Sequence, residues 1–469
     1  MSSRGRNVFA LALLSAGVGS LLVAQEGSSA PARLGRDVLR EMIEVNTTDA
    51  HGSTTVLANK LAARFTAAGF PATDVQVVGP ADSTRHHSLV VRWRGTGTAR
   101  PFLLLAHLDV VEARREDWSF DPFTLVERDG FFYGRGTTDV KGPAATLVAS
   151  LLQLKSEGFT PSRDIILALT SGEESGNSNG VEWLLANRRD LIDAAFVVNV
   201  DGGGGALRGG RRTAFHVQAA EKVYQSFAFT VRDRGGHSSL PTRGNPIYRL
   251  ARALGRLDGY AFPATLNSVT RAYFTNSADL VDGPSGEAMR RFVANTGDAA
   301  AVATLSADLV YNALIRTTCV ATMLVGGHAE NALPQLARAT VNCRMMPGSD
   351  PDSVRATLAR VIANTGVAVE FMGKATPSAP TALSSEVAAT LDRVITGLWG
   401  RVPVLQMMET GATDGLYLRN RGIPVFGLSG IFFDVEDDRA HGRDERIGVA
   451  SFDEGLEFMR RLLRELAGP

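Results

Sequence analysis

The sequence predicts an α/β protein in which a mostly parallel sheet flanked by helices is interrupted by a smaller α+β domain. Two observations support this fold class. In the first half of the chain, segments of helical periodicity alternate with short apolar runs typical of buried strands, at 88–93, 102–105, 165–169 and 196–200. Further on, apolar residues recur with a period of two, typical of antiparallel strands with one solvated face, at 225–231 and 339–345.

The helical segments and the return of the first pattern set the domain boundaries. Helices are expected within 34–70 and at 144–157 and 181–187. After the period-two strands, the α/β pattern resumes with a helix, a strand and a closing helix at 385–398, 425–428 and 452–466. We therefore expect a first part of the α/β domain at 34–217, an inserted domain at 218–375 and a second part of the α/β domain at 376–469.

Residues 1–24 have the order of a secretory signal peptide, and residues 25–33 are expected to form a polar linker. Two arginines precede an apolar run at 8–22, and the small residues around Ala24 suit signal peptidase. An uncleaved membrane anchor is the alternative, although the run is short for a full membrane span. The sequence thus predicts a secreted or periplasmic protein with no membrane contact after cleavage.

The charge balance and the cysteine content exclude some classes of protein. Basic and acidic residues are balanced at 49 each, and no basic tail is present, so nucleic acid is not an expected partner. The two cysteines, Cys319 and Cys343, are too few for a disulfide scaffold, and their spacing is not that of a zinc site. In an exported protein they could pair, or they could be two small buried residues, and both interpretations stay open here.

Polar side chains follow three of the expected strands, at the point where each strand ends. They are one imidazole and four carboxylates, namely His107, Asp109, Glu173, Glu174 and Asp201. In open α/β sheets the crevice at the carboxyl ends of the strands is where ligands bind. Because so many anions in one crevice repel each other unless cations are present, we expect a pair of divalent metal ions there.

Two loop residues complete the candidate metal site. Asp139 lies in a glycine-rich stretch just before the helix at 144–157, and His441 follows the last strand. Mixed imidazole and carboxylate ligands suit zinc, with cobalt or manganese as alternatives. Taken singly, a histidine at a strand end is more often structural, and a carboxylate in such a place is more often a turn residue or a helix cap. The ordered combination is what predicts two metal ions.

These motifs resemble one family of dinuclear zinc peptidases and amidohydrolases, which includes glutamate carboxypeptidase, acetylornithine deacetylase, succinyl-diaminopimelate desuccinylase and aminoacylase. The resemblance follows the order of the motifs over nearly the whole chain after residue 24: His107-Leu-Asp109, Gly134-Arg-Gly-Thr-Thr-Asp139-Val-Lys-Gly142, Ser171-Gly-Glu173-Glu174, Asp201 and His441. It implies a catalytic α/β domain interrupted by a smaller lid or dimerisation domain.

The resemblance also implies a role for each residue. Asp139 would bridge both zinc ions. His107 and Asp201 would complete one metal site, and Glu174 and His441 would complete the other. Asp109 would hold the His107 ring in its metal-binding tautomer. Glu173 would be the general base that takes a proton from the attacking water.

The inserted domain and a late loop carry further residues that match the family. His237, in a Gly-His-Ser context, would stabilise the oxyanion, often from the partner subunit of a homodimer. Asn331 and Arg344 resemble the substrate-binding residues of the lid, and an arginine can bind a carboxylate bidentately. Gly411 and Asp414 resemble the loop that lines the substrate pocket.

The expected reaction is hydrolysis of a peptide or N-acyl amide bond next to a free carboxylate, in a small peptide or an N-acyl amino acid. Asp201 stands where several acylases of the family have Glu, which favours a carboxypeptidase or dipeptidase. The alternative is an aminoacylase-like N-acyl amino-acid hydrolase whose acyl pocket is lined by the apolar segment 431–433. A binding protein on a catalytically dead scaffold is disfavoured, because Glu173 and all five metal-binding residues are present.

Overall fold

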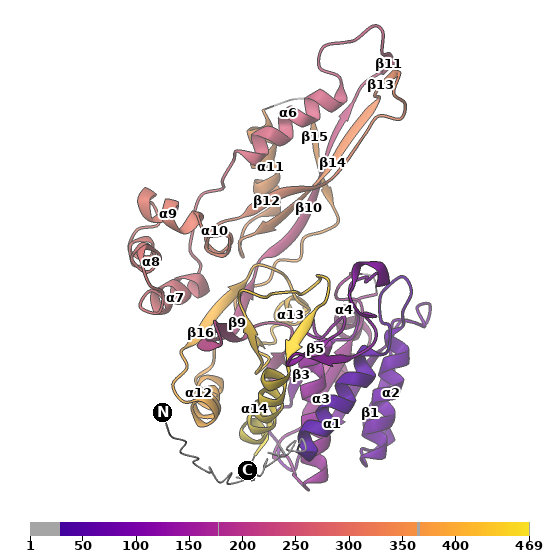
Figure 1. Cartoon of the computed structure of the whole chain (residues 1–469), viewed down its shortest axis with the longest axis vertical. Helices are drawn as coiled ribbons and strands as arrows, with labels where there is room; N and C mark the ends of the chain where they lie inside the picture. Colours follow the sequence, from indigo (N-terminus) through magenta and orange to yellow (C-terminus); the bar gives the residue numbers. More distant parts are fainter. Residues whose placement is uncertain (1–28, 177, 364–365, 469) are drawn as a thin grey trace, which may run out of the picture.

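The computed structural model describes residues 29–176, 178–363 and 366–468 and consists of two bodies joined near β9 and β10 (Figure 1). The larger body is built on a ten-stranded mixed sheet. Its strands, in spatial order, are β1 (Val75–Val78), β2 (Ser88–Trp93), β6 (Ile165–Thr170), β3 (Phe102–His107), β7 (Val197–Asn199), β17 (Val425–Gly427), β9 (Arg211–Glu221), β8 (Gly204–Arg208) and β18 (Phe432–Asp434), with β16 (Val404–Glu409) paired to β9. The centre of the sheet, from β6 to β17, is parallel, whereas β1, β2 and β6 pair antiparallel at one edge. The predicted α/β class is thus confirmed.

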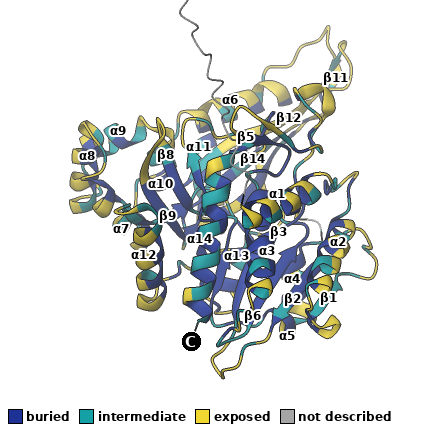
Figure 2. Ribbon diagram, turned by 60° about the horizontal axis from the view of Figure 1, so that its bottom comes forward, coloured by how far each residue is buried: buried dark blue, intermediate teal, exposed yellow. Residues whose placement is uncertain are grey.

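Helices cover both faces of this sheet. One face carries α1 (Ala30–Ile43), α2 (Thr54–Ala67), α3 (Lys141–Ser156), α12 (Ser385–Trp399) and α14 (Val449–Ala467), and the other carries α4 (Gly180–Asn187), α5 (Arg189–Ile192) and α13 (Gly415–Arg419). Every residue of β3 and β6 is buried, which is why these strands read as continuous apolar runs in the sequence (Figure 2).

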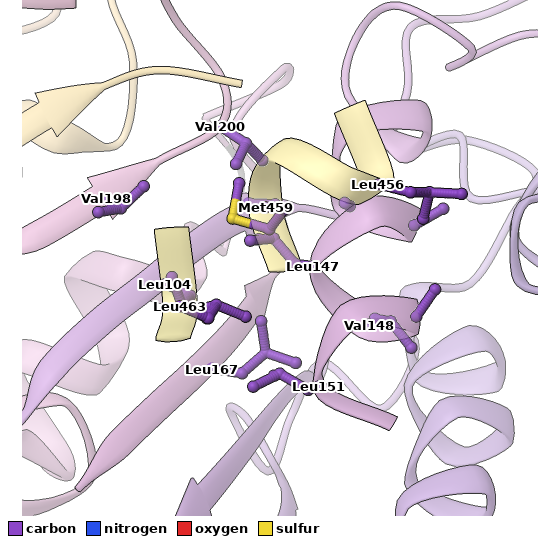
Figure 3. Close-up of a cluster of buried hydrophobic side chains, with 14 of the residues drawn as sticks. Leu104, Leu147, Val148, Leu151, Leu167, Val198, Val200, Leu456, Met459 and Leu463 are labelled. Atoms are coloured by element: carbon purple, nitrogen blue, oxygen red, sulfur yellow. The ribbon is translucent and has the colours of Figure 1, made fainter. Parts of the chain in front are cut away.

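The main core lies between the parallel strands and the helices α3 and α14. Leu104 and Leu167 project from β3 and β6 toward Leu147 of α3 and Met459 of α14 (Figure 3). All four side chains are fully buried. Burying a side chain of this size contributes about 1.5–3 kcal/mol, so this core holds the strand ends rigidly in place.

Helix α1 begins earlier than the sequence indicates. Residues 25–33 were expected to form a linker, but α1 starts at Ala30, capped by the Ser29 hydroxyl and with Pro31 in its first turn. A proline is compatible with the first turn of a helix because its missing N–H has no intrahelical partner there. The expected signal peptide at 1–24 and the start of the linker lie outside the described residues.

The smaller body is built on a four-stranded antiparallel sheet in the order β12 (Thr318–Gly326), β14 (Leu336–Met345), β10 (Val223–Arg232) and β15 (Ala368–Met372). Helices α6 (Pro246–Asp258) and α11 (Pro351–Ile362) pack on one face of it. The short strands β11 (Gly236–His237) and β13 (Ala332–Leu333) pair at the end of this body that points away from the large sheet (Figure 1).

Four helices of the inserted segment form a separate cluster, for which the sequence carries no motif. They are α7 (Ser268–Ser277), α8 (Pro284–Ala294), α9 (Ala299–Ser306) and α10 (Leu309–Ile315). Phe274 and Phe292 pack there with Ala219 of β9 and Met408 of β16, which belong to the larger body. This part of 218–375 therefore shares its core with the end of the large sheet rather than with the smaller sheet.

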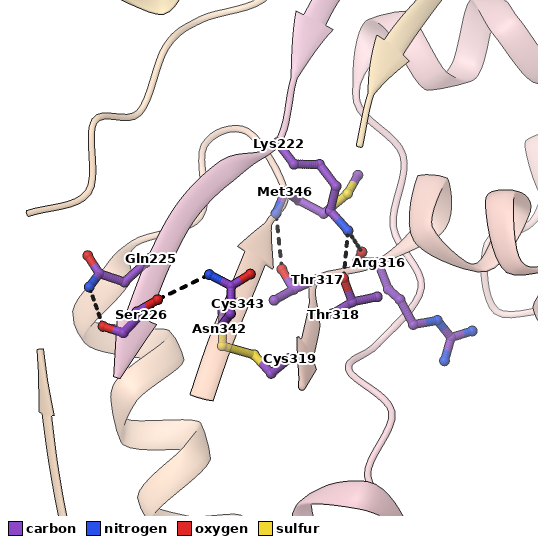
Figure 4. Close-up of a disulfide and its surroundings, with 10 residues drawn as sticks. All are labelled: Lys222, Gln225, Ser226, Arg316, Thr317, Thr318, Cys319, Asn342, Cys343 and Met346. Carbon is purple, nitrogen blue, oxygen red and sulfur yellow. Dashed lines mark hydrogen bonds between the residues drawn. A yellow bond between two sulfur atoms is a disulfide. The ribbon is translucent and has the colours of Figure 1, made fainter. Parts of the chain in front are cut away.

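Cys319 and Cys343 form a disulfide between β12 and β14, where they are directly opposed in the strand register (Figure 4). This decides between the two alternatives that the sequence leaves open. The remaining elements are a three-stranded sheet of β4 (Val126–Arg128), β5 (Phe131–Tyr133) and β19 (Arg446–Gly448), and the short 3₁₀ turns η1 (Ala72–Asp74) and η2 (Arg115–Asp117). In the described part of the chain, no helix is both long and apolar enough to cross a membrane.

Candidate metal centre

The three strands that carry the expected ligands are neighbours in the sheet. β6, β3 and β7 run parallel side by side, so their carboxyl ends meet at one edge. His107 is the last residue of β3, while Glu173 and Glu174 follow β6 and Asp201 follows β7. The fold thus brings these four side chains to one place.

Asp139 lies between the two imidazoles. Its Oδ1 is 3.1 Å from His107 Nε2, and its Oδ2 is 3.0 Å from His441 Nε2. Asp201 Oδ1 lies 3.6 Å from His107 Nε2, and Glu174 Oε2 lies 3.1 Å from His441 Nε2. The side chains therefore form two groups, each with one imidazole and one further carboxylate, and the two groups share Asp139.

The cluster contains more carboxylates than imidazoles, and this leaves a surplus of acidic groups. Burial raises the pKa of Asp201 to about 7, against the influence of the nearby His107. Burial also raises the pKa of Glu173 well above its usual range, and the charge of Asp201 adds to the rise. Hydrogen bonds to Asp139 and Glu174 raise the pKa of His441 to about 10. Divalent cations balance such a surplus, and the mixture of imidazole and carboxylate donors fits them.

Asp109 differs from its expected role. The backbone carbonyl of Asp109, not its carboxylate, lies 2.9 Å from His107 Nδ1, and the carboxylate Oδ1 is 3.9 Å away. The carboxylate instead accepts hydrogen bonds from the backbone N–H groups of Glu173 and Glu174, at 3.3 and 3.0 Å. The carbonyl orients the ring, and the carboxylate holds the loop that carries the two glutamates.

Asp414 is buried and hydrogen-bonded within the fold. Its carboxylate accepts hydrogen bonds from Asn179 Nδ2 at 2.6 Å and from Thr170 Oγ1 at 3.1 Å, and burial raises its pKa to about 6. Both its oxygens are thus engaged beneath the end of β6, and a role of Asp414 in binding substrate stays a prediction. Gly411, in the same loop, is exposed.

Arg344 lies on the side of the smaller body that faces the metal cluster. It is on β14, and its guanidinium carbon lies 4.7 Å from the ring centre of Tyr224 on β10. Burial lowers the pKa of Arg344, and the charges of Tyr224 and Glu173 oppose this, which places Glu173 nearby. Within the described residues, Arg344 forms no ion pair with a carboxylate.

His237 and Asn331 lie together, away from the other site residues of their own chain. His237 is in β11 and Asn331 directly precedes β13, at the far end of the smaller body (Figure 1). Both are exposed, and the Ser238 N–H donates to the Asn331 carbonyl at 3.1 Å. The structure therefore does not bring these two residues to the cluster formed by His107 and Asp139.

Two buried residues of the site were not anticipated from the sequence. Glu445 accepts hydrogen bonds from the backbone of the loop that carries Asp139, and it pairs with Arg135. Arg135 in turn donates to the carbonyl of His441. Both lie inside motifs recognised for other residues, in Gly134-Arg135-Gly136 and four residues after His441. A charged residue in each of two motifs is the only signal that the sequence offers.

Comparison with known proteins places these features in a family. Residues 103–465 match Peptidase family M20/M25/M40. The N-fatty-acyl-amino acid synthase/hydrolase PM20D1 of Xenopus tropicalis is 29% identical over 78% of this chain and 72% of its own length. The probable carboxypeptidase S-like 2 of Dictyostelium discoideum is 28% identical over 81% and 74%. The succinyl-diaminopimelate desuccinylase of Dinoroseobacter shibae is 29% identical over 86% and 92%.

Solved structures share the fold. The M20 family metallo-carboxypeptidase Sso-CP2 from Sulfolobus solfataricus superposes with a TM-score of 0.69 at 17% identity, covering 92% of this chain and 98% of that one. Human carnosine dipeptidase 1 superposes with a TM-score of 0.66 at 17% identity, covering 93% and 97%.

Proposed function

Because this chain belongs to Peptidase family M20/M25/M40, a family of metallopeptidases and amidohydrolases, we propose that it hydrolyses a peptide or N-acyl amide bond next to a free carboxylate, using two metal ions. The observation that carries the proposal is the position of Asp139, whose two carboxylate oxygens face His107 and His441 at 3.1 and 3.0 Å. One carboxylate shared by two ligand groups is the arrangement that a pair of cations requires.

The ligands divide between two cations. Asp139 would bridge them, His107 and Asp201 would complete one site, and Glu174 and His441 would complete the other. Zinc suits this donor set, with cobalt or manganese as alternatives. When bound, such cations polarise the scissile carbonyl and lower the pKa of water.

Glu173 and Arg344 supply the remaining chemistry. Glu173 takes the proton of the attacking water at its carboxylate and returns it to the leaving nitrogen. Its raised pKa, caused by burial and by the charge of Asp201, suits a group that must accept and then release a proton. Arg344 has no ion pair among the described residues and lies near Glu173, so it binds the free carboxylate of the substrate.

The substrate is a small peptide, as for a carboxypeptidase or dipeptidase. Asp201, where several acylases have Glu, favours this reaction. The alternative, an N-acyl amino acid, is supported by the name of the PM20D1 relative. The apolar segment thought to line an acyl pocket does not support it, because Ile431 and Phe432 are buried in the main core and Phe433 packs against that core.

The chain acts as a homodimer in which His237 of one protomer reaches the metal centre of its partner. This accounts for the position of His237 far from its own cluster. The edge strand β12 offers a contact surface, since its apolar side chains are largely exposed: Val320, Met323, Leu324 and Val325. An unprotected apolar edge strand is a template for pairing with another chain.

The protein is secreted or periplasmic. Two features support this location: the order of charged, apolar and small residues in 1–24, and the disulfide between Cys319 and Cys343. Disulfides persist in oxidising compartments and are rare in the cytosol.

The proposed function is tested with a panel of free dipeptides, N-blocked dipeptides and N-acyl amino acids, each with and without a free carboxylate, in the presence of zinc. We expect turnover only of substrates with the free carboxylate, loss of turnover on chelation, and recovery with zinc or cobalt. Arg344→Lys keeps the charge but loses the bidentate fork, so KM should rise more than kcat falls. Full activity in metal-free protein would contradict the proposal.

A further inference from the structure

We propose that the buried pair Arg135–Glu445 is a positioning unit that holds Asp139 and His441 in register and thereby maintains the cation site of His441 and Glu174. Glu445 is fully buried, Arg135 is 2% exposed, and Arg135 Nη1 lies 2.7 Å from Glu445 Oε2. The inference rests on the two-cation centre proposed above and concerns residues that neither bind a cation nor touch substrate.

Glu445 acts on the loop of Asp139. Its Oε1 accepts hydrogen bonds from the N–H of Asp139 at 3.0 Å and from both the N–H and the hydroxyl of Thr138 at 2.7 Å. Its Oε2 accepts from the N–H of Gly136 at 3.0 Å. Three backbone N–H groups of this loop thus point to one carboxylate, much as in an anion-binding nest, and this fixes the backbone of Asp139.

Arg135 acts on the loop of His441. Its Nη2 donates to the carbonyls of His441 and Gly442 at 3.3 and 3.0 Å. The guanidinium carbon lies 4.9 Å from the ring centre of Trp118, which supports it from one face. The planar fork of an arginine lets one side chain bind Glu445 and these carbonyls at once, which the single ammonium of a lysine does poorly.

His441 needs such support. It is a non-glycine residue with a φ of +60°, a region that side-chain-bearing residues rarely adopt unless the surroundings hold them there. Its side chain is 54% exposed, and within the described part of the chain its ring contacts two carboxylates, those of Asp139 and Glu174. The orientation of the imidazole therefore depends on the backbone that Arg135 holds.

The two cation sites depend on this pair to different degrees. His107 and Asp201 are positioned by β3 and β7, which the main core holds. His441 lies in a loop whose backbone Arg135 anchors, and the bridging Asp139 is held by Glu445. Loss of the pair should therefore weaken the site of His441 and Glu174 first and leave one cation bound at His107 and Asp201.

The experiment titrates zinc, and separately cobalt, into metal-free wild type, Glu445→Gln, Arg135→Lys and Glu221→Gln, with a competing chelator that reports free metal. Glu221→Gln is the matched control. It breaks another buried ion pair, Glu221–Arg419, whose side chains are each 2% exposed and which contacts neither ligand loop. Unfolding of each metal-free variant by heat is measured alongside.

We expect Glu221→Gln to bind two cations, each with the same affinity as in wild type. Glu445→Gln should keep one tight cation and bind the second about 10–100-fold more weakly, as is typical when a residue that holds a ligand is lost. Arg135→Lys should show a smaller loss at the same site. Saturating zinc should restore much of the turnover of both variants.

Three results overturn the inference. If Glu445→Gln and Arg135→Lys both bind two cations as tightly as wild type, the Arg135–Glu445 pair has no positioning role. A parallel loss of both cations that tracks the loss of thermal stability, and that Glu221→Gln reproduces, makes the pair a general stabilising element. If the wild-type chain does not bind two cations, both the proposed function and this inference are refuted. In the first two results wild type still binds two cations, so the failures can be told apart.

Discussion

Asp109 contacts His107 through its backbone: the carbonyl oxygen lies 2.9 Å from His107 Nδ1, whereas the carboxylate Oδ1 lies 3.9 Å away. A backbone carbonyl orients a ligating histidine as well as a carboxylate does, because it accepts the same N–H. The carboxylate is thereby free to anchor the N–H groups of Glu173 and Glu174. Substitution of the side chain should then affect the glutamate loop more than the histidine.

Asp109→Ala should reduce turnover about 10–100-fold, since the loop of Glu173 and Glu174 loses both its anchors. The cation held by His107 and Asp201 should be retained, because the carbonyl remains. Asp109→Asn keeps one acceptor oxygen, so its turnover should fall less than that of Asp109→Ala. Zinc content and kcat measured side by side check this. If Asp109→Ala loses the His107 cation first, the carboxylate does orient that ring.

His237 should act only across a dimer. His237→Ala alone should lower turnover by about a hundredfold or more, which is the usual contribution of an oxyanion donor. Mixing His237→Ala chains with Glu173→Gln chains should restore part of the activity, since one site of each heterodimer then has both residues.

The control is each variant mixed with itself, which should stay inactive. Sedimentation measured alongside should show a dimer. A monomeric chain, or a His237→Ala variant with normal turnover, removes this role from His237.

The strand ends of the site could be predicted from the sequence, whereas the residues that hold them could not. His107, Glu173 and Asp201 follow buried apolar runs, and parallel strands deliver their ends to one edge. Glu445 and Arg135 lie far apart in the chain and meet only because β19 pairs with β5. No local pattern encodes that contact.

The distant position of His237 has a similar cause. A Gly-His-Ser sequence indicates a loop but not where the loop lies, and the long strands β10 and β14 carry it away from the large sheet. The helices α7–α10 carry no motif either. Their apolar faces pack against β16, which lies outside the expected boundary of the inserted domain, and against the end of β9, which lies just inside it.

His216 should make the fold less stable in acid. Burial lowers its pKa to about 4 from the usual 6.5. Between these pH values the unfolded chain binds a proton that the folded chain does not. The free energy of unfolding therefore rises with pH across this window, and the contribution of His216 to it is lost as the pH falls from 6.5 through 4. The slope is at most about 1.4 kcal/mol per pH unit, reduced because the ring is only partly buried.

Denaturant unfolding of wild type and His216→Gln from pH 4 to pH 7 checks this, with metal-free protein so that cation release does not contribute. The variant should show a flatter dependence on pH in this window. Tyr273, whose ring centre lies 6.3 Å from that of His216, offers the control Tyr273→Phe, which should keep the slope. Equal slopes in wild type and His216→Gln would show that His216 is accessible to protons in the fold.

Glu173 and Glu174 should be separable as base and ligand. Adjacent residues that leave a strand point in different directions, so the two carboxylates need not share a task. Glu174 Oε2 lies 3.1 Å from His441 Nε2, within the group that binds one cation. Glu173 is the one whose pKa burial raises well above its usual range, and its charge acts on Arg344, the residue proposed to bind the carboxylate of the substrate.

Glu173→Gln keeps the shape of the side chain but cannot accept a proton, so turnover should fall roughly a hundred- to ten-thousandfold while zinc content and thermal stability stay nearly unchanged. Glu174→Gln should instead weaken one zinc site, because a neutral amide is a poorer ligand than a carboxylate, and added zinc should recover part of its turnover. Zinc content measured beside turnover in both variants distinguishes the two roles. If Glu173→Gln loses zinc while Glu174→Gln keeps both ions, the assignment is reversed. If Glu173→Gln remains fully active, the proton passes through another group.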